Sequence, residues 1–255
     1  MSVLLEAKGI GKRFGGVQAL KDVSLTIREK EIYGLIGPNG AGKTTFFNVL
    51  TGLYAKDGGE VHFAGAPLEL GSPHRVAAAG IARTFQNIRL FGNMTARENV
   101  MVGRHLRTSA GVFGAILRTR AQRTEEAAIR RSASELLRYV GIAHRADDLA
   151  RHLSYGDQRR LEIARALATE PKLLALDEPA AGMNATETAA LRELIAGLRA
   201  DGLTVLLIEH DVKLVMGLCD RVAVLDHGEK IAEDVPAAVR ADPKVIEAYL
   251  GTSAH

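Results

Sequence analysis

A glycine-rich segment at residues 37–44 constrains this chain more than any other feature of its sequence. It reads Gly-Pro-Asn-Gly-Ala-Gly-Lys-Thr and fits the pattern G-x-x-x-x-G-K-[ST]. An apolar run at 31–36 predicts a strand before it, and a helical pattern follows from residue 43 to about 53. Glycines let such a loop curl so that successive N–H groups point inward at phosphate oxygens, and the helix N-terminus adds the positive end of its dipole. The segment therefore predicts a phosphate-binding loop.

Two side chains of this loop indicate which phosphate compound it binds. Lys43 is expected to place a cation between a β- and a γ-phosphate, and the Thr44 hydroxyl is expected to ligate Mg²⁺. The predicted ligands are therefore ATP and Mg²⁺. The residues expected to bind the nucleotide in this segment are Gly37, Pro38, Asn39, Gly40, Ala41, Gly42, Lys43, Thr44 and Thr45.

The apolar runs elsewhere in the chain predict an α/β fold. Strand patterns alternate with helical ones, and several strands are apolar on both faces, which is typical of a parallel sheet covered by helices on both sides. A helical block at about 87–155 interrupts this alternation and is interpreted as an inserted subdomain. Strands are predicted at 3–7, 23–27, 31–36, 61–64, 81–85, 173–176, 204–208 and 222–225, and helices at 43–53, 157–168 and 185–200.

Two adjacent carboxylates follow the apolar run at 173–176. Ligands bind at the carboxyl ends of the strands of a parallel sheet, so Asp177 and Glu178 are expected to lie beside the phosphate loop. Asp177 is then placed to orient Mg²⁺, mostly through the water shell of the ion. Glu178 is placed to polarise the attacking water as a general base. Together with the phosphate loop, this pair predicts hydrolysis of ATP.

Composition excludes several other classes of protein. The net charge of +3 and the 5% of aromatic residues do not fit a nucleic-acid-binding face, so no nucleic acid partner is expected. The single cysteine, Cys219, excludes an intrachain disulfide and favours a reducing compartment. No apolar run reaches the ~18 residues of a membrane span, and the N-terminus lacks a signal-peptide pattern. Any membrane association is therefore expected to go through a partner.

A second loop, at residues 153–158, indicates a family. It reads Leu-Ser-Tyr-Gly-Asp-Gln and stands before a helical pattern. It resembles the signature loop, usually Leu-Ser-Gly-Gly-Gln, of the ATP-binding subunits of ATP-binding-cassette (ABC) transporters, and the resemblance runs from end to end of the chain. Tyr155 and Asp157 depart from the usual loop. Ser154 and Gly156 are retained, and by this resemblance they offer a hydroxyl and a close backbone approach to a γ-phosphate.

The resemblance implies roles for three further side chains. Gln86 matches the glutamine that senses Mg²⁺ and the attacking water, at the junction with the helical insert. His210 matches the switch histidine that contacts the γ-phosphate. Phe14 matches the aromatic residue that stacks on adenine, with a place in the core as the alternative. Asn184 stands where the family usually has Asp, which removes a charge from the loop after the two carboxylates.

The resemblance also implies an architecture. It comprises a P-loop NTPase (RecA-like) parallel-sheet core, an N-terminal antiparallel β-subdomain and an inserted ABC-type α-helical subdomain. The whole chain, 1–255, is expected to be one ABC ATP-binding domain. The insert is expected at about 87–155 with the signature loop at its end, and a C-terminal helical tail at about 235–255. In the family, two ATP-binding subunits enclose two ATP molecules head to tail, so the expected partner is an identical copy or a paralogue.

Longer stretches are similar to the importers of branched-chain (hydrophobic) amino acids. They lie at 83–91, 94–95, 98–100, 180–184, 208–211, 215–216 and 245–251. This similarity implies integral-membrane permease subunits as partners, a periplasmic solute-binding protein as an indirect partner, and a peripheral location at the cytoplasmic face of the inner membrane. Importers of urea or other small solutes, lipopolysaccharide exporters and soluble non-transport ABC proteins remain as alternatives. A simple kinase would leave the signature loop unexplained.

Overall fold

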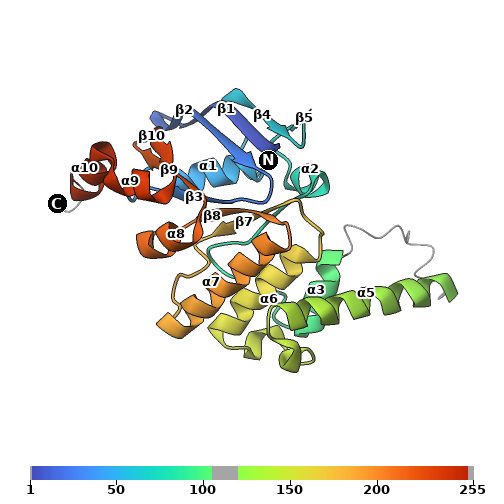
Figure 1. Ribbon diagram of the computed structural model, residues 1–255. Helices are drawn as coiled ribbons and strands as arrows, with labels where there is room; N and C mark the ends of the chain where they lie inside the picture. Colours follow the sequence, from blue (N-terminus) through green and yellow to red (C-terminus); the bar gives the residue numbers. More distant parts are fainter. Residues whose placement is uncertain (1, 105–119, 252–255) are drawn as a thin grey trace. The chain divides into compact units, whose positions relative to one another are not determined.

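The computed structural model of the protein describes residues 2–104 and 120–251. Figure 1 follows the chain from its blue N-terminal strands to its red C-terminal helices. The chain divides into two compact units, one formed by Met1–Gln86 with Lys172–His255 and the other by Asn87–Pro171. Within the described residues, no helix is both long and apolar enough to cross a membrane.

In the described part of the first unit, the strands form two sheets. The first sheet is antiparallel, in the order β2-β1-β4-β5, and the second has the order β10-β9-β3-β8-β7-β6. In the second sheet β9, β3, β8, β7 and β6 run parallel, and β10 pairs antiparallel with β9. The predicted combination of an antiparallel N-terminal sheet with a parallel core sheet is therefore confirmed. The strands are β1 (Val3–Phe14), β2 (Val17–Arg28), β3 (Ile32–Ile36), β4 (Gly58–Phe63), β5 (Ala66–Pro67), β6 (Ile81–Arg83), β7 (Leu173–Asp177), β8 (Thr204–Ile208), β9 (Arg221–Asp226) and β10 (Glu229–Asp234).

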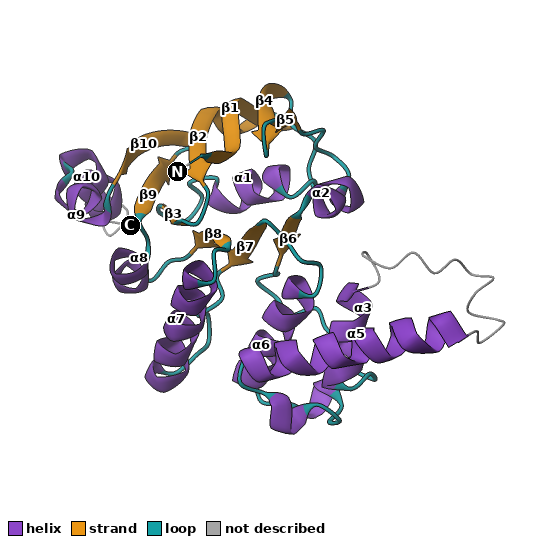
Figure 2. Cartoon of the chain, turned by 45° about the vertical axis from the view of Figure 1, so that its right-hand side comes forward, coloured by secondary structure: helices purple, strands orange, loops and turns teal. Residues whose placement is uncertain are grey.

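Helices cover both faces of the parallel sheet in this unit. Figure 2 shows α1 between the two sheets, where Phe46 and Phe47 are fully buried in the core. All residues of β3, β7 and β8 are buried, as expected for strands covered on both faces. The helices of this unit are α1 (Lys43–Leu50), α2 (Pro73–Ala79), α7 (Ala185–Ala200), α8 (Val212–Leu218), α9 (Pro236–Ala241) and α10 (Pro243–Gly251).

Helix ends follow local capping chemistry more closely than hydrophobic periodicity. The helix predicted at 185–200 is confirmed, and Asn184 begins it with a capping box that includes Glu187. The helix predicted at 43–53 ends three residues early, at Leu50, because Gly52 turns the chain with a φ of +77°. The short helices α2 and α8 were not predicted, although a Pro at the first turn of α2 and the Asp211 cap of α8 are start signals.

The second unit is helical in its described part. It contains α3 (Ala96–Arg104), α5 (Arg120–Tyr139) and α6 (Tyr155–Leu167), with 3₁₀ turns at Ala143–Arg145 and Ala150–His152. Val100, Leu137 and Leu161, one from each helix, are fully buried. The part of the predicted helical block at 105–119 lies outside the described residues, as do residues 252–255 of the predicted tail.

Helices α3 and α6 approach each other closely at Gly103. A Cβ atom at this position would lie 2.3 Å from the carbonyl oxygen of Arg165 and 3.1 Å from Cβ of Ala168. The backbone at Gly103 is helical, so any residue type fits its conformation. Glycine is therefore required here by the lack of space at the helix crossing. The backbone conformation does not require it.

We predict that Gly103→Ala lowers the free energy of unfolding by about 1–3 kcal/mol, the usual cost of overpacking. The loss should appear although alanine is the better helix former. Urea denaturation followed by circular dichroism measures it. Gly92→Ala is the control in the same unit, because its new methyl would meet only Cβ of Arg151 at 3.5 Å, an ordinary contact. Equal stability of the two variants would contradict the close crossing of α3 and α6.

Candidate functional site

A cavity of about 500 Å³ opens in the first unit around the phosphate loop. Its size lies in the range of about 300–1,000 Å³ that is typical of small-molecule sites. Most of the predicted phosphate-loop residues line it, together with Gln86, Glu178 and His210. The full set of lining residues is Val17, Gln18, Ala19, Asn39, Gly40, Ala41, Gly42, Lys43, Thr44, Thr45, Gln86, Glu178, His210, His227 and Gly228.

The phosphate loop connects the end of β3 to the start of α1. Gly37, its first residue, has a φ of +150°, and a Cβ there would lie 2.1 Å from the carbonyl oxygen of Leu225 in β9. Gly42, at the N-cap of α1, has a φ of +98°. Both positions combine a left-handed backbone with a close neighbour, so each requires glycine. The loop is therefore held against the neighbouring strand with no room for a side chain.

The Lys43 side chain folds back over this loop. Its Nζ atom donates hydrogen bonds to the carbonyl oxygens of Gly37, at 2.7 Å, and Pro38, at 2.8 Å. The residue is only 4% exposed. Burial lowers the pKa of Lys43 below its usual value, and the charge of Glu178 partly opposes this shift. A phosphate group in the cavity would favour the charged ammonium, as the predicted role of Lys43 requires.

Glu178 is the centre of a polar cluster on the opposite wall. Its Oε2 accepts a hydrogen bond from Nε2 of Gln86 at 2.7 Å, and its Oε1 lies 2.5 Å from Nε2 of His210. The structure thus brings together the three side chains for which we predicted a role in catalysis. Glu178 also has a φ of +47°, in the left-handed region that a residue other than glycine occupies only at a cost of about 1–3 kcal/mol. Such strain clusters at active sites.

Asp177 lies behind the cavity. It is 3% exposed, it is not among the lining residues, and its backbone N–H donates to the Thr84 hydroxyl at 3.4 Å. Oxygen donors of Thr44, Gln86 and Glu178 line the cavity in front of it. Among the described residues, no group of three or more His, Cys, Asp or Glu is placed to hold a metal alone. This donor set fits Mg²⁺, which is usually held by one or two carboxylates together with substrate phosphates.

Two supports of the site were not predicted. Glu209 is buried, and its carboxylate accepts hydrogen bonds from the backbone N–H of Ala180 at 2.8 Å and of His210 at 3.2 Å. It joins the loop after the carboxylates to the loop that carries His210. Burial raises the pKa of Glu209 above its usual value, against the lowering effect of these bonds. A charged residue directly after the apolar strand β8 was the available signal.

The second unpredicted support is the turn between β9 and β10. The Gly228 N–H donates to the carbonyl of Ala41 at 3.0 Å, and the Gly228 carbonyl accepts from the N–H of Lys21 at 2.8 Å. A Cβ at Gly228 would lie 2.7 Å from the carbonyl oxygen of Ala19. The turn therefore packs directly against the phosphate loop, and it supplies His227 and Gly228 to the cavity wall.

Phe14 is not among the residues that line this cavity. It lies at the end of β1, where its side chain is 44% exposed and meets Tyr54 edge-on at a centroid distance of 5.3 Å. The alternative place in the core does not fit this exposure. Neighbouring residues of β2, from Val17 to Ala19, line the cavity instead.

The signature-loop residues belong to the second unit. Ser154 begins α6, and its hydroxyl accepts a hydrogen bond from the backbone N–H of Asp157 at 3.2 Å. Gly156 is buried in the first turn of the helix. The Tyr155 hydroxyl accepts from the buried Arg159 side chain at 2.9 Å, as expected for packing within the helical unit. Asp157 lies in the first turn of α6, where its negative charge interacts favourably with the helix dipole.

Comparison with known proteins gives one consistent result. Residues 20–181 match the family model described as ABC transporter, and residues 229–255 match the model described as branched-chain amino acid ATP-binding cassette transporter. The chain is 49% identical to the high-affinity branched-chain amino acid transport ATP-binding protein LivG of Salmonella typhimurium over 97% of this chain and 98% of LivG.

Solved structures give the same result for the fold. An ATP-binding cassette of an ABC transporter in its ADP conformation has a TM-score of 0.85 and 32% identity, over 98% of this chain and 100% of that one. A dimeric ATP-binding cassette in a post-hydrolysis state with ADP and phosphate has a TM-score of 0.77 and 26% identity, over 91% of this chain and 99% of that one.

We predict that Gly228→Ala weakens nucleotide binding roughly tenfold, equivalent to about 1.4 kcal/mol. The new methyl would displace the turn that supports the phosphate loop. Gly65→Ala is the matched control, because Gly65 has the same φ of +80° but nothing within 4 Å of its Cβ position. Both variants carry the same backbone strain, so titration calorimetry with ATP should separate them. Equal affinities would contradict the supporting role of the turn.

Proposed function

The chain belongs to the ABC transporter family, and we propose that it hydrolyses ATP to energise the uptake of branched-chain (hydrophobic) amino acids through a separate permease. The family resemblance predicted from the signature loop is confirmed by the match over residues 20–181. Similarity over nearly the full length to a branched-chain amino acid transport protein supports the proposed cargo. The match of residues 229–255 to a branched-chain amino acid cassette model also supports it.

The observation that carries the proposal is the position of Glu178 in the cavity of the phosphate loop. Gln86 and His210 hold its carboxylate from two sides, and Lys43 lies in the same cavity. In this arrangement Glu178 accepts a proton from water as a general base. Lys43 and the loop N–H groups stabilise the charge that develops on the phosphates. Thr44 and Asp177 are the residues that would hold Mg²⁺, which would supply positive charge to neutralise the phosphates.

The proposed working form contains two ATP-binding subunits. Ser154 and Gly156 stand at the N-terminus of α6, a position suited to an anion. We infer that these residues close over ATP bound to the phosphate loop of a second subunit, which is an identical copy or a paralogue. The similarity to a cassette solved as a dimer with ADP and phosphate supports this arrangement.

Transport requires membrane partners in this proposal. We infer that the segment after Gln86, at about 87–95, contacts integral-membrane permease subunits, so that the chain works at the cytoplasmic face of the membrane. A periplasmic solute-binding protein would deliver the amino acid to the permease. Coupling requires that ATP bind the closed pair of subunits more tightly than the open pair. Equal affinities would not change the equilibrium between the two forms.

The cargo is tested by uptake. Cells that lack the gene should lose high-affinity uptake of labelled leucine, isoleucine and valine, and expression of the intact chain should restore it. Urea uptake, measured in the same cells, should remain unchanged. Loss of urea uptake alone would show that the chain serves another transport system. It would not contradict the proposed ATPase activity.

We predict that Glu178→Gln keeps ATP binding and lowers ATP turnover at least 100-fold, because removal of a general base costs about 10²–10⁴-fold. Phosphate release and nucleotide affinity should be measured on the same preparation. Glu69→Gln is the control, since this carboxylate is exposed, forms an ion pair with Arg75 and does not line the cavity. Persistent hydrolysis in Glu178→Gln would remove Glu178 from the role of base.

We predict that Ser154→Arg prevents closure of the two subunits and leaves the ATP affinity of the single subunit within about twofold of normal. A long cation at the start of α6 would block the approach of another subunit to this loop. Sizing chromatography in the Glu178→Gln background, where ATP should trap the dimer, measures closure. A collapse of ATP affinity in the single subunit would instead show that the signature loop acts within its own chain.

A further inference from the structure

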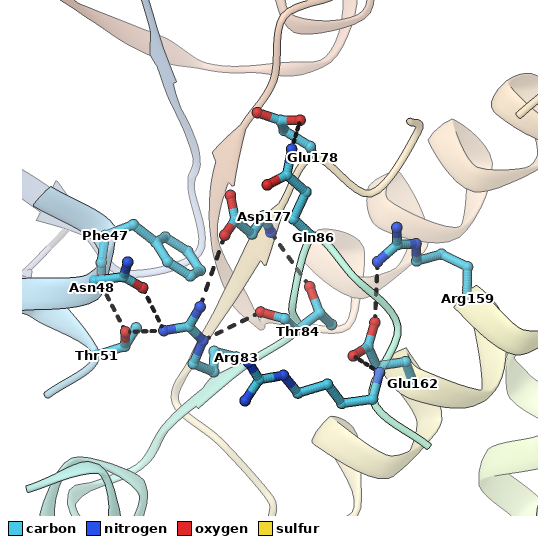
Figure 3. Close-up of polar contacts among 11 residues, drawn as sticks. Phe47, Asn48, Thr51, Arg83, Thr84, Gln86, Arg159, Glu162, Asp177 and Glu178 are labelled. Atoms are coloured by element: carbon cyan, nitrogen blue, oxygen red, sulfur yellow. Dashed lines mark hydrogen bonds and ion pairs between the residues drawn. The ribbon is translucent and has the colours of Figure 1, made fainter. Parts of the chain in front are cut away.

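Arg83 is a largely buried cation beside the site, and the proposed function does not include a role for it. It is the last residue of β6, three positions before Gln86, and its side chain is 12% exposed. Figure 3 shows its guanidinium among residues of three elements: its own strand, α1 and the end of β7. A charge of this kind is costly to bury unless its surroundings use it.

The first set of contacts joins Arg83 to α1, the helix that begins at the phosphate loop. Its Nη1 atom donates to Oδ1 of Asn48 at 3.0 Å and to Oγ1 of Thr51 at 2.7 Å. Its Nε atom donates to the carbonyl of Thr84 at 3.3 Å. The Nη1 atom of the guanidinium therefore links β6 to α1 and to Thr51, the C-cap residue of this helix.

The second set of contacts fixes the plane of the guanidinium. The Arg83 Cζ atom lies 4.5 Å from the ring centroid of Phe47 and 4.4 Å from that of Phe85. A planar guanidinium stacks on aromatic rings in a way that the compact ammonium of lysine does not reproduce. The two rings thus restrict the direction in which the remaining nitrogen of Arg83 points.

That remaining nitrogen is directed at Asp177. The Nη2 atom of Arg83 lies 3.8 Å from Oδ2 of Asp177, an ion pair between two side chains that are both largely buried. Thr84, the next residue, accepts a hydrogen bond from the backbone N–H of Asp177 at 3.4 Å. Gln86 of the same segment donates to Glu178. The segment 83–86 therefore contacts both carboxylates at the end of β7.

We propose that Arg83 is a positioning residue that sets where the Asp177 carboxylate lies relative to the phosphate loop, and thereby sets the affinity for the Mg²⁺ that accompanies the nucleotide. The inference rests on the proposed function, since it concerns the same nucleotide site. Arg83 is not among the residues that line the cavity, so we infer that it acts indirectly. It acts by connecting α1, whose first residues include Lys43 and Thr44, to the strand that carries Asp177.

Arg83→Lys tests this inference because it keeps the charge near Asp177 and removes the fork and the stacking. The affinity for a non-hydrolysable ATP analogue should be measured by calorimetry in EDTA and again with graded Mg²⁺. We expect the affinity in EDTA to be unchanged. The factor by which Mg²⁺ increases the affinity should fall roughly tenfold, the lower end of the usual effect of removing a residue that orients a metal ligand.

Arg221→Lys is the matched control. Arg221 is a similarly embedded cation, with a side chain 22% exposed, an ion pair to Glu233 at 2.6 Å and a hydrogen bond to the Thr26 carbonyl at 3.0 Å. Its guanidinium also lies 5.5 Å from the centroid of the Tyr33 ring. It begins β9, at the end of the parallel strands opposite to the cavity. We expect it to lower thermal stability but to leave the Mg²⁺ effect as in the unaltered protein.

Two results would overturn the inference. One is an Arg83→Lys protein whose Mg²⁺ effect equals that of Arg221→Lys, which would make Arg83 a structural cross-link alone. The other is an unaltered protein that binds the analogue without any Mg²⁺ effect, which would also remove the proposed ATPase function. If Arg83→Lys does not fold, Thr51→Val removes one anchor of the guanidinium instead. That variant should reduce the Mg²⁺ effect in the same direction by a smaller factor, and an unchanged effect would contradict the proposal.

Discussion

The close backbone approach at the phosphate loop is the constraint on which the rest of the site depends. Gly37 lies so near the Leu225 carbonyl that no side chain fits, and the turn at Gly228 is hydrogen-bonded to Ala41. These contacts fix the curl of the loop, and its residues from Asn39 to Thr45 line one cavity. The parallel order of the core strands then brings the carboxylates of β7 and the histidine after β8 to the same edge of the sheet. Backbone packing around the loop therefore positions the groups that are proposed to hydrolyse ATP.

Around this loop, buried charges connect neighbouring segments and hold the site together. Glu209 joins the backbones of Ala180 and His210, and Arg83 joins α1 to the end of β7. Charged groups in such surroundings are stable only while every hydrogen bond is made. Each of them therefore makes the position of one reactive side chain depend on that of another. The carboxylate of Glu178, whose backbone has a φ of +47°, is held by Gln86 from the segment that follows Arg83.

The sequence predicts much of this arrangement, and the limits of the prediction have physical causes. The phosphate loop and the two carboxylates are predicted from strand patterns, because strand ends meet at one edge of a parallel sheet. Gln86 and His210 are predicted from the family resemblance, and the structure places both in the same cavity. Gly228 and Glu209 were not identified, because their roles depend on β9 lying beside β3 and on which loops then touch. Local residue patterns carry no information on strand order. Phe14 is a further example. Its family motif places it in the nucleotide site, but the described cavity is lined by neighbouring residues of β2 instead.

The strand order also has a consequence for how the protein is made. β3 emerges from the ribosome well before β8 and β9, its partners in the sheet. The Gly37 backbone is additionally hydrogen-bonded to Tyr249 in the last helix. A growing chain therefore cannot complete its nucleotide pocket until β8 and β9 have been synthesised. Pairing between such distant segments is slow to form and leaves strands exposed meanwhile. The early part of the chain must be kept from aggregating during that interval, and an unfinished subunit has no ATP site with which to recruit a partner.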